Sequence, residues 1–142
     1  MNYEKILLFI TVLYFVGCGT NSRQMVIENT QQLQVRTYQT KEYDYPKKIV
    51  AKAGVSALQD LGFVIDKADL QTGTVTATKL SKGATMRITL VAREKGDKKS
   101  TIRANAQYGS NMQAPILVED PEIYHSFFQV LDKAIFFEKE NI

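Results

Sequence analysis

Few residues of this chain could perform covalent or metal chemistry. The 142 residues include one cysteine, Cys18, and one histidine, His125. A single cysteine excludes a disulfide within the chain, so the fold must be stabilised by packing. His125 has no second ligand candidate four residues further on, which favours a surface or core-rim position over a metal site. The sequence also has no glycine-rich phosphate loop, nucleophile elbow or His-Glu zinc motif.

A pair of acids remains as a candidate for catalysis. Asp66 and Asp69 flank an expected hairpin turn, where they could serve as acid and base. Acids at such turns are more often solvated or bonded to the backbone. The serines have no base partner that the sequence identifies. We therefore expect a non-enzymatic protein without catalytic, cofactor-binding or metal-binding residues, and without a cofactor.

The chain also has no strong excess of charge and no long apolar run. It carries 18 Lys and Arg against 15 Asp and Glu, a net charge of +3. The lysines are scattered, which does not predict a nucleic-acid partner. The apolar run at residues 6–16 is too short to span a bilayer comfortably.

The N-terminus is typical of an export signal. A short polar segment with one lysine precedes the apolar run, and Gly17 supplies the small residue before a cleavage site. The ending Phe-Val-Gly-Cys at residues 15–18 resembles the lipobox of bacterial lipoproteins, although leucine is commoner than phenylalanine at its start. That resemblance implies lipidation of Cys18 and cleavage before it. The alternatives are an uncleaved anchor helix and an ordinary secretory signal.

Lipidation would place the protein in the cell envelope. Each buried methylene contributes about 0.8 kcal/mol, so two or three acyl chains hold a small domain on a membrane. The residue after the cysteine is Gly19 and not aspartate. In lipoproteins of enteric-type bacteria, this implies a position at the inner leaflet of the outer membrane, facing the periplasm. We expect a signal peptide at residues 1–17, a lipidated tether at 18–30 and one domain at 31–142.

Apolar periodicity predicts an α+β domain with the order β-α-β-β-β-β-α. Alternating apolar and polar side chains indicate strands, and apolar residues at spacings of three and four indicate helices. The expected strands cover residues 32–40, 63–67, 74–79, 86–93 and 102–108, and the expected helices begin at residues 46 and 121. Residues 109–119 are expected to form a loop.

Capping signals support both helices. Asp44 and Pro46 mark the start of the first helix, and Gly62 marks its end. Asp120 and Pro121 begin the last helix. Small residues near the middle of the first helix should let it lie close to a sheet: Ala53, Gly54 and Ala57.

The last helix is apolar over more than half of its circumference, from Ile123 to Phe137. Such a helix must be covered on several sides. We therefore expect a curved antiparallel sheet of four to five strands around it. This order of elements resembles the helix-grip domains in the lipoprotein subunit of the outer-membrane β-barrel assembly machine.

A further resemblance covers residues 35–142. Its segments look like a family of small, largely uncharacterised bacterial envelope lipoproteins. The resemblance implies fold and location and carries no activity. The segments are Val-Arg-Thr at 35–37, Ala-Leu-Gln-Asp-Leu-Gly-Phe at 57–63, Ile65-Asp66, Gly73, Thr78-Lys79, Tyr124, Phe127-Phe128 and Phe-Phe-Glu at 136–138.

Two surface features are candidates for partner binding. Arginines on one hairpin could meet anionic lipid head groups or an acidic protein, or could simply keep a sheet face solvated. An apolar loop before the last helix could dock on another protein or close the core. The candidate residues are Arg87, Arg93 and Arg103 on the hairpin, and Met112, Ile116 and Leu117 in the loop.

These features predict a membrane-anchored protein that binds another envelope protein, as an accessory of an assembly, secretion or efflux machine. The alternative is a carrier of a lipid or other small apolar molecule, held between the sheet and the C-terminal helix. A filled core with an exposed apolar patch would favour the first. A cavity would favour the second, if lined by Met86, Ile88, Ile102, Tyr108, Phe127 and Phe128.

Overall fold

The computed structural model describes residues 21–81, 83–110 and 113–141. The chain divides into two units, residues 1–33 and 34–142. Helix α2 (Asn21–Gln39) runs across this boundary, and the strands of the described residues belong to the second unit. Cys18 and Met112 lie outside the described residues, so their expected roles stay predictions.

The predicted strand at residues 32–40 is wrong, because the chain is helical as far as Gln39. Among residues 29–39 of this helix, the less exposed ones are Val35, Tyr38 and Gln39, and their spacing of three and four is that of a helix face. Leu33, counted toward the strand pattern, is 64% exposed. Residues 21–30, expected in the tether, are helical as well.

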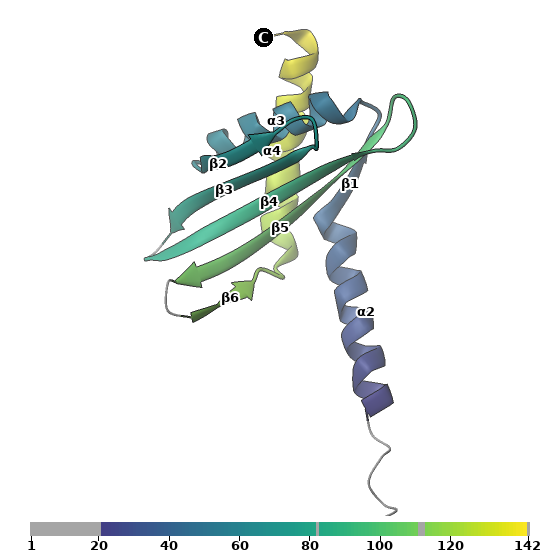
Figure 1. The fold of residues 1–142 in the computed structure, drawn as a ribbon, viewed down its shortest axis with the longest axis vertical. Coiled ribbons are helices and arrows are strands. Elements are labelled where there is room, and N and C mark those ends of the chain that lie inside the picture. The colour runs from purple at the N-terminus through teal and green to yellow at the C-terminus, as the bar shows by residue number, and fades with distance from the viewer. Residues whose placement is uncertain (1–20, 82, 111–112, 142) are drawn as a thin grey trace, which may run out of the picture. The chain divides into compact units, whose positions relative to one another are not determined.

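Six antiparallel strands form one open sheet in the second unit (Figure 1). Five of them follow the order β1-β5-β4-β3-β2, and β6 also pairs with β5. The α+β class is confirmed, but the described chain has one strand and one helix more than the upper limit predicted. The strands are β1 (Thr40–Tyr43), β2 (Val64–Asp69), β3 (Thr74–Ser81), β4 (Ala84–Glu94), β5 (Ser100–Ser110) and β6 (Gln113–Leu117).

Strand β6 lies where the sequence predicts only a loop. Strand β1 is short and pairs with the first part of β5, with Thr40 opposite Arg103. The second part of β5 therefore has a free edge. Strand β6 occupies it, with Leu117 opposite Gln107 and Gln113 opposite Ser110. Strand β6 forms because the edge of β5 is unpaired there. The sequence of its own five residues gives little indication of a strand.

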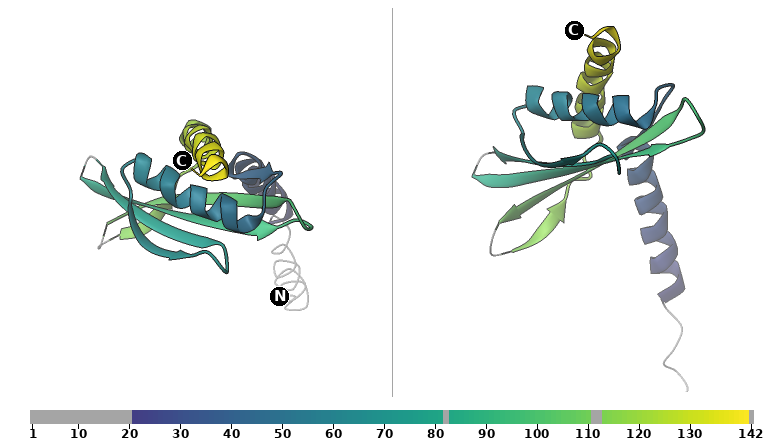
Figure 2. Two further views of the ribbon diagram at one scale, coloured as in Figure 1. Left: turned by 90° about the horizontal axis from the view of Figure 1, so that it is seen from above. Right: turned by 45° about the horizontal axis from the view of Figure 1, so that its top comes forward.

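Helices α3 (Lys47–Asp60) and α4 (Pro121–Glu140) lie over the same face of the sheet (Figure 2). Gly54 allows the close approach of α3 that its small residues predict, because a Cβ there would lie 2.9 Å from a Leu90 methyl group. Gly62 ends α3 with a positive φ of 79°. The Phe63 amide then donates to the Leu58 carbonyl at 2.9 Å, which confirms the predicted glycine cap.

The cap of α4 is confirmed and that of α3 is corrected. The Asp120 carboxylate accepts a hydrogen bond from the Glu122 amide at 3.0 Å. Pro46, in contrast, is the N-cap of α3, and no side chain caps that helix end. Asp44 instead pairs with Lys99 at 3.1 Å. A proline provides a suitable φ for starting a helix without a capping side chain.

The apolar surface of α4 is only partly covered. Its first two thirds provide core residues, among them Tyr124, Phe128 and Leu131. Phe136 and Phe137, however, are 57% and 49% exposed. The expectation that the sheet covers the whole apolar surface is therefore wrong for the last turns. Those two rings contact each other edge to face, with centroids 5.9 Å apart.

Tyr124 joins three elements inside the core. Its hydroxyl donates to the Val118 carbonyl at 2.6 Å and accepts hydrogen bonds from the Ala106 amide and the Gln39 side chain. Ala106 lies on β5 between the segments that pair with β1 and β6. The fully buried hydroxyl thus supplies a partner that no strand offers there.

Candidate functional site

A cavity of about 310 Å³, partly open to solvent, lies between the sheet and the two helices that cover it. Its volume is at the lower end of the range for small-molecule sites. Most of the lining side chains are apolar, and two at the rim are charged. The lining residues are Leu61, Phe63, Lys79, Met86, Ile88, Glu122, Ile123, Ser126 and Phe127.

The floor of the cavity comes from β4. Met86 and Ile88 are buried and alternate with exposed Arg87, so both side chains point toward the helices. Met86 lies opposite Lys79 of β3 in the strand register. The Lys79 side chain is therefore delivered to the same face, at the edge of the floor.

The walls come from the end of α3 and the beginning of α4. The turn at Gly62 reverses the chain and brings Phe63 to the rim beside Leu61. Ile123 and Phe127 are four residues apart, and so lie on one face of α4. The cavity thus depends on a helix cap, a strand pair and a helix face that are distant in sequence.

The polar groups of the rim are held in specific positions. The Lys79 ammonium donates a hydrogen bond to the Leu61 carbonyl at 2.6 Å and lies 5.7 Å from the centroid of the Phe63 ring. Glu122 lies in the first turn of α4, where the helix dipole favours an acid. The arrangement offers apolar contact area with one positive and one negative group beside it.

The structure brings together only part of the cavity that the sequence suggested. Met86, Ile88 and Phe127 line it. Ile102 and Phe128 belong to the packed core instead, at 0% and 6% exposure. Sequence reasoning missed the rim. The glycine cap before Phe63 was the one signal that could have found it, since such caps fold an apolar residue back onto the helix.

The three candidate arginines lie on the face of the sheet that α3 and α4 leave uncovered. Arg93 is opposite Thr101 and Arg103 is opposite Val91, which makes the two arginines diagonal neighbours. Arg87 is six residues from Arg93 along β4, about 20 Å away. Within the described part of the chain none of the three forms an ion pair.

The lysines of the same hairpin are engaged differently. Lys95 pairs with Glu42 of β1, and Lys99 pairs with Asp44 at 3.1 Å. The pKa of Lys99 is raised by its hydrogen bond and attraction to Asp44. These lysines hold the turn against β1 and the loop after it. Among the described residues, the cations of this hairpin that form no ion pair are Lys98 and the three arginines.

The apolar segment before α4 divides between core and surface. Val118 is 5% exposed and belongs to the core. Ile116 and Leu117 are 65% and 66% exposed. They alternate along β6 and so point to opposite faces of the sheet, with Ile116 opposite Tyr108 and Leu117 opposite Gln107. Gln107 lies opposite Arg87 in turn, which puts Leu117 in the cross-strand row of that arginine.

The two candidate acids are bonded locally. The Asp69 carboxylate accepts hydrogen bonds from the amides of Gln71 and Thr72 at 2.9 and 3.0 Å. Bonding to Thr72, chiefly through its backbone amide, lowers the pKa of Asp69. Asp66 accepts a hydrogen bond from the Thr78 hydroxyl at 3.0 Å.

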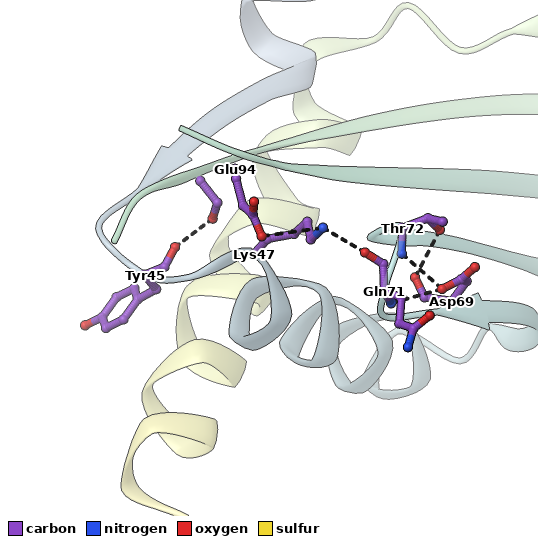
Figure 3. A network of polar contacts seen from close by, with 7 residues as sticks. Tyr45, Lys47, Asp69, Gln71, Thr72 and Glu94 are labelled. Carbon is purple, nitrogen blue, oxygen red and sulfur yellow. Dashed lines mark hydrogen bonds and ion pairs between the residues drawn. The ribbon is translucent and has the colours of Figure 1, made fainter. Parts of the chain in front are cut away.

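The turn that holds Asp69 is itself tied to α3 (Figure 3). The Lys47 ammonium donates to the Gln71 carbonyl at 2.7 Å and lies 3.6 Å from the Glu94 carboxylate. Lys47 thus links the beginning of α3 to this turn and to the end of β4. The polar groups of this region serve the fold.

His125 is exposed on α4 and lies 3.0 Å from the Gln129 side-chain nitrogen. Among the residues that the structure describes, no three His, Cys, Asp or Glu side chains are placed to hold a metal ion together. In the same part of the chain, no helix combines the length and the apolar character needed to cross a membrane.

No protein-family model and no curated protein matches this chain. Among the described residues, the cavity and the arginine-bearing sheet face are the two features on which a functional proposal can rest. The cavity is the more specific of the two, since separate elements converge on it.

Proposed function

We propose that this protein is a non-enzymatic, lipid-anchored lipoprotein of the cell envelope whose α+β domain binds a small apolar ligand in the cavity between the sheet and α4. The observation that carries the proposal is the cavity itself. Small-molecule sites in proteins are concave and mainly apolar, with a few polar groups that orient the ligand. An opening of about 310 Å³ with mainly apolar walls is therefore a candidate binding site.

The anchor and the helix-grip likeness belong to the same proposal. The Phe-Val-Gly-Cys ending at residues 15–18 supports lipidation of Cys18. Gly19 supports a position at the inner leaflet of the outer membrane, facing the periplasm. The position of α4 over one face of the antiparallel sheet supports the helix-grip likeness.

Photolabelling of the full chain tests the cavity. A neutral decanol analogue bearing a diazirine should label peptides that contain Met86, Ile123 or Phe127, as mapped by mass spectrometry. Ser126 is exposed at the rim, so Ser126→Phe should fill the opening without removing a core contact. We expect labelling of these peptides to fall about tenfold, as for the loss of roughly 1.4 kcal/mol of binding.

The adjacent variant His125→Phe is the matched control, because His125 is exposed on the same helix but does not line the cavity. It should label like the parent chain. Labelling that is equal in the parent and Ser126→Phe, or that maps away from the lining residues, would contradict the proposal.

A second function is favoured by the arginine-bearing face. We propose that an acidic envelope protein binds there, with this chain as an accessory of an assembly, secretion or efflux machine. The unpaired charges of Arg87, Arg93 and Arg103 support it, as does exposed Leu117 in the same row as Arg87. Charge attraction of this kind steers association and falls as salt rises.

Replacing Arg87, Arg93 and Arg103 with glutamine should reduce the amount of partner captured from cross-linked membranes, more at low salt than at moderate salt. Folding should hardly change, because exposed charges contribute little to stability. A control chain with Lys48, Lys133 and Lys139 replaced by glutamine loses the same net charge from the helices. Equal capture by the arginine variant and this control would mean that the arginines only solvate the sheet.

A further inference from the structure

Lys79 differs from the other half-buried lysines of the described chain. Lys41 and Lys47 are also half-buried, and each lies within ion-pair distance of a carboxylate: Asp132 at 2.7 Å and Glu94 at 3.6 Å. Lys79 has no such partner among the described residues. A partly desolvated ammonium without a counter-charge is unfavourable, so its position calls for an anion.

The ammonium of Lys79 is held in place at the cavity rim. Its hydrogen bond to the Leu61 carbonyl uses one of its three donors and leaves two for a ligand. The end of α3 carries partial negative charge, and the Phe63 ring offers its face, so both fix the ammonium without neutralising it fully. Apolar Met86 lies opposite Lys79 on β4.

We infer that the ligand of the cavity is a medium-chain fatty acid, with its chain against the apolar walls and its carboxylate on Lys79. This inference rests on the proposed binding of an apolar ligand in the same cavity. A single chain suits a volume of about 310 Å³, at the lower end for small-molecule sites. A carboxylate supplies the negative charge that Lys79 lacks and accepts two hydrogen bonds from it.

Glu122 allows a second test of the inference, because it is the only carboxylate among the lining residues. Its negative charge at the rim repels an anionic head group and has no effect on the charge of a neutral one. Removing the charge of Lys79 and removing that of Glu122 should therefore change the affinity for a fatty acid in opposite directions.

Competition against the neutral photolabel on the full chain tests this. Decanoate and decanol have the same chain length and differ in the charge of the head group at pH 7. Decanoate should displace the label at about tenfold lower concentration than decanol, a difference of about 1.4 kcal/mol, which is close to the lower limit for a hydrogen bond to a charged group. Lys79→Met should abolish this preference, and Lys79→Arg should keep most of it.

Glu122→Gln should enlarge the preference for decanoate by about two- to fivefold, as expected for an exposed charge. Lys67→Met is the matched control, since Lys67 is an exposed lysine on β2 that does not line the cavity. It should leave the preference unchanged. If Lys79 had only a structural role, Lys79→Met would weaken the binding of decanol and decanoate equally.

Two results separate the failure of this inference from that of the proposed function. Suppose that decanoate and decanol displace the label equally in the parent chain and that Glu122→Gln has no effect. This result would contradict the binding of a carboxylate by Lys79, but it would still support the binding of an apolar ligand in the cavity. Labelling that neither compound displaces would overturn both.

Discussion

Phe128→Ala should lower the free energy of unfolding by about 3 to 5 kcal/mol. Phe128 is 6% exposed on α4, and its ring packs edge to face on Phe127 with centroids 5.2 Å apart. Truncation to alanine removes buried apolar area and leaves a cavity that the surrounding helix and sheet close only in part. The loss is a large share of the 5 to 15 kcal/mol typical of a domain.

Urea unfolding of the full chain measures this, as a lower midpoint with little change of slope. Phe136→Ala is the matched control, because the same residue type on the same helix is 57% exposed there. Its cost should stay within about 1 kcal/mol. Similar midpoints for the two variants would show that the first half of α4 does not contribute to the core as described.

Gly73→Ala should cost about 3 kcal/mol. Gly73 has a φ of +78°, which a side chain disfavours by about 1 to 2 kcal/mol. A Cβ would also lie 2.4 Å from the Ala92 carbonyl oxygen, so the backbone itself would have to move. That movement would weaken the hydrogen bonds of Gly73 with Asp69 and Ala92, both 2.8 Å long and each contributing about 1 kcal/mol.

Gly96→Ala separates the two causes. Gly96 has a similar φ of +76°, but a Cβ there meets nothing within 4 Å. Its urea midpoint should fall only by the conformational cost of about 1 to 2 kcal/mol. If Gly73→Ala and Gly96→Ala lowered the midpoint equally, the close approach of the β2–β3 turn to β4 would not contribute to stability.

The parts of this fold that the sequence predicts correctly are those with strong local patterns. The alternation of Met86, Ile88 and Leu90 depends only on which face of a strand is buried, and β4 follows it. The cap at Asp120 and the glycine end at Gly62 are satisfied within a few residues. Such features need no knowledge of the rest of the chain.

The wrong predictions concern residues whose secondary structure or exposure depends on contacts with residues that are distant in sequence. The residues before Gln39 have an irregular apolar pattern. Gln39 is the last residue of a helix, and its side chain is buried and hydrogen-bonded to Tyr124. Strand β6 forms because β1 is too short to cover β5. The exposure of Phe136 depends on which elements pack against the end of α4, which no local pattern records.

By itself, the sequence determined the α+β class, the central strands, the end of α3 and the start of α4, because periodicity and capping are local properties of the backbone. It also placed Met86, Ile88 and Phe127 on apolar faces. Only the tertiary structure decided that these faces leave a cavity between them, and that Lys79 lies at its rim with no carboxylate within ion-pair distance among the described residues. Packing between elements that are remote in sequence sets both of these features, and they depend on distances that a sequence pattern does not contain.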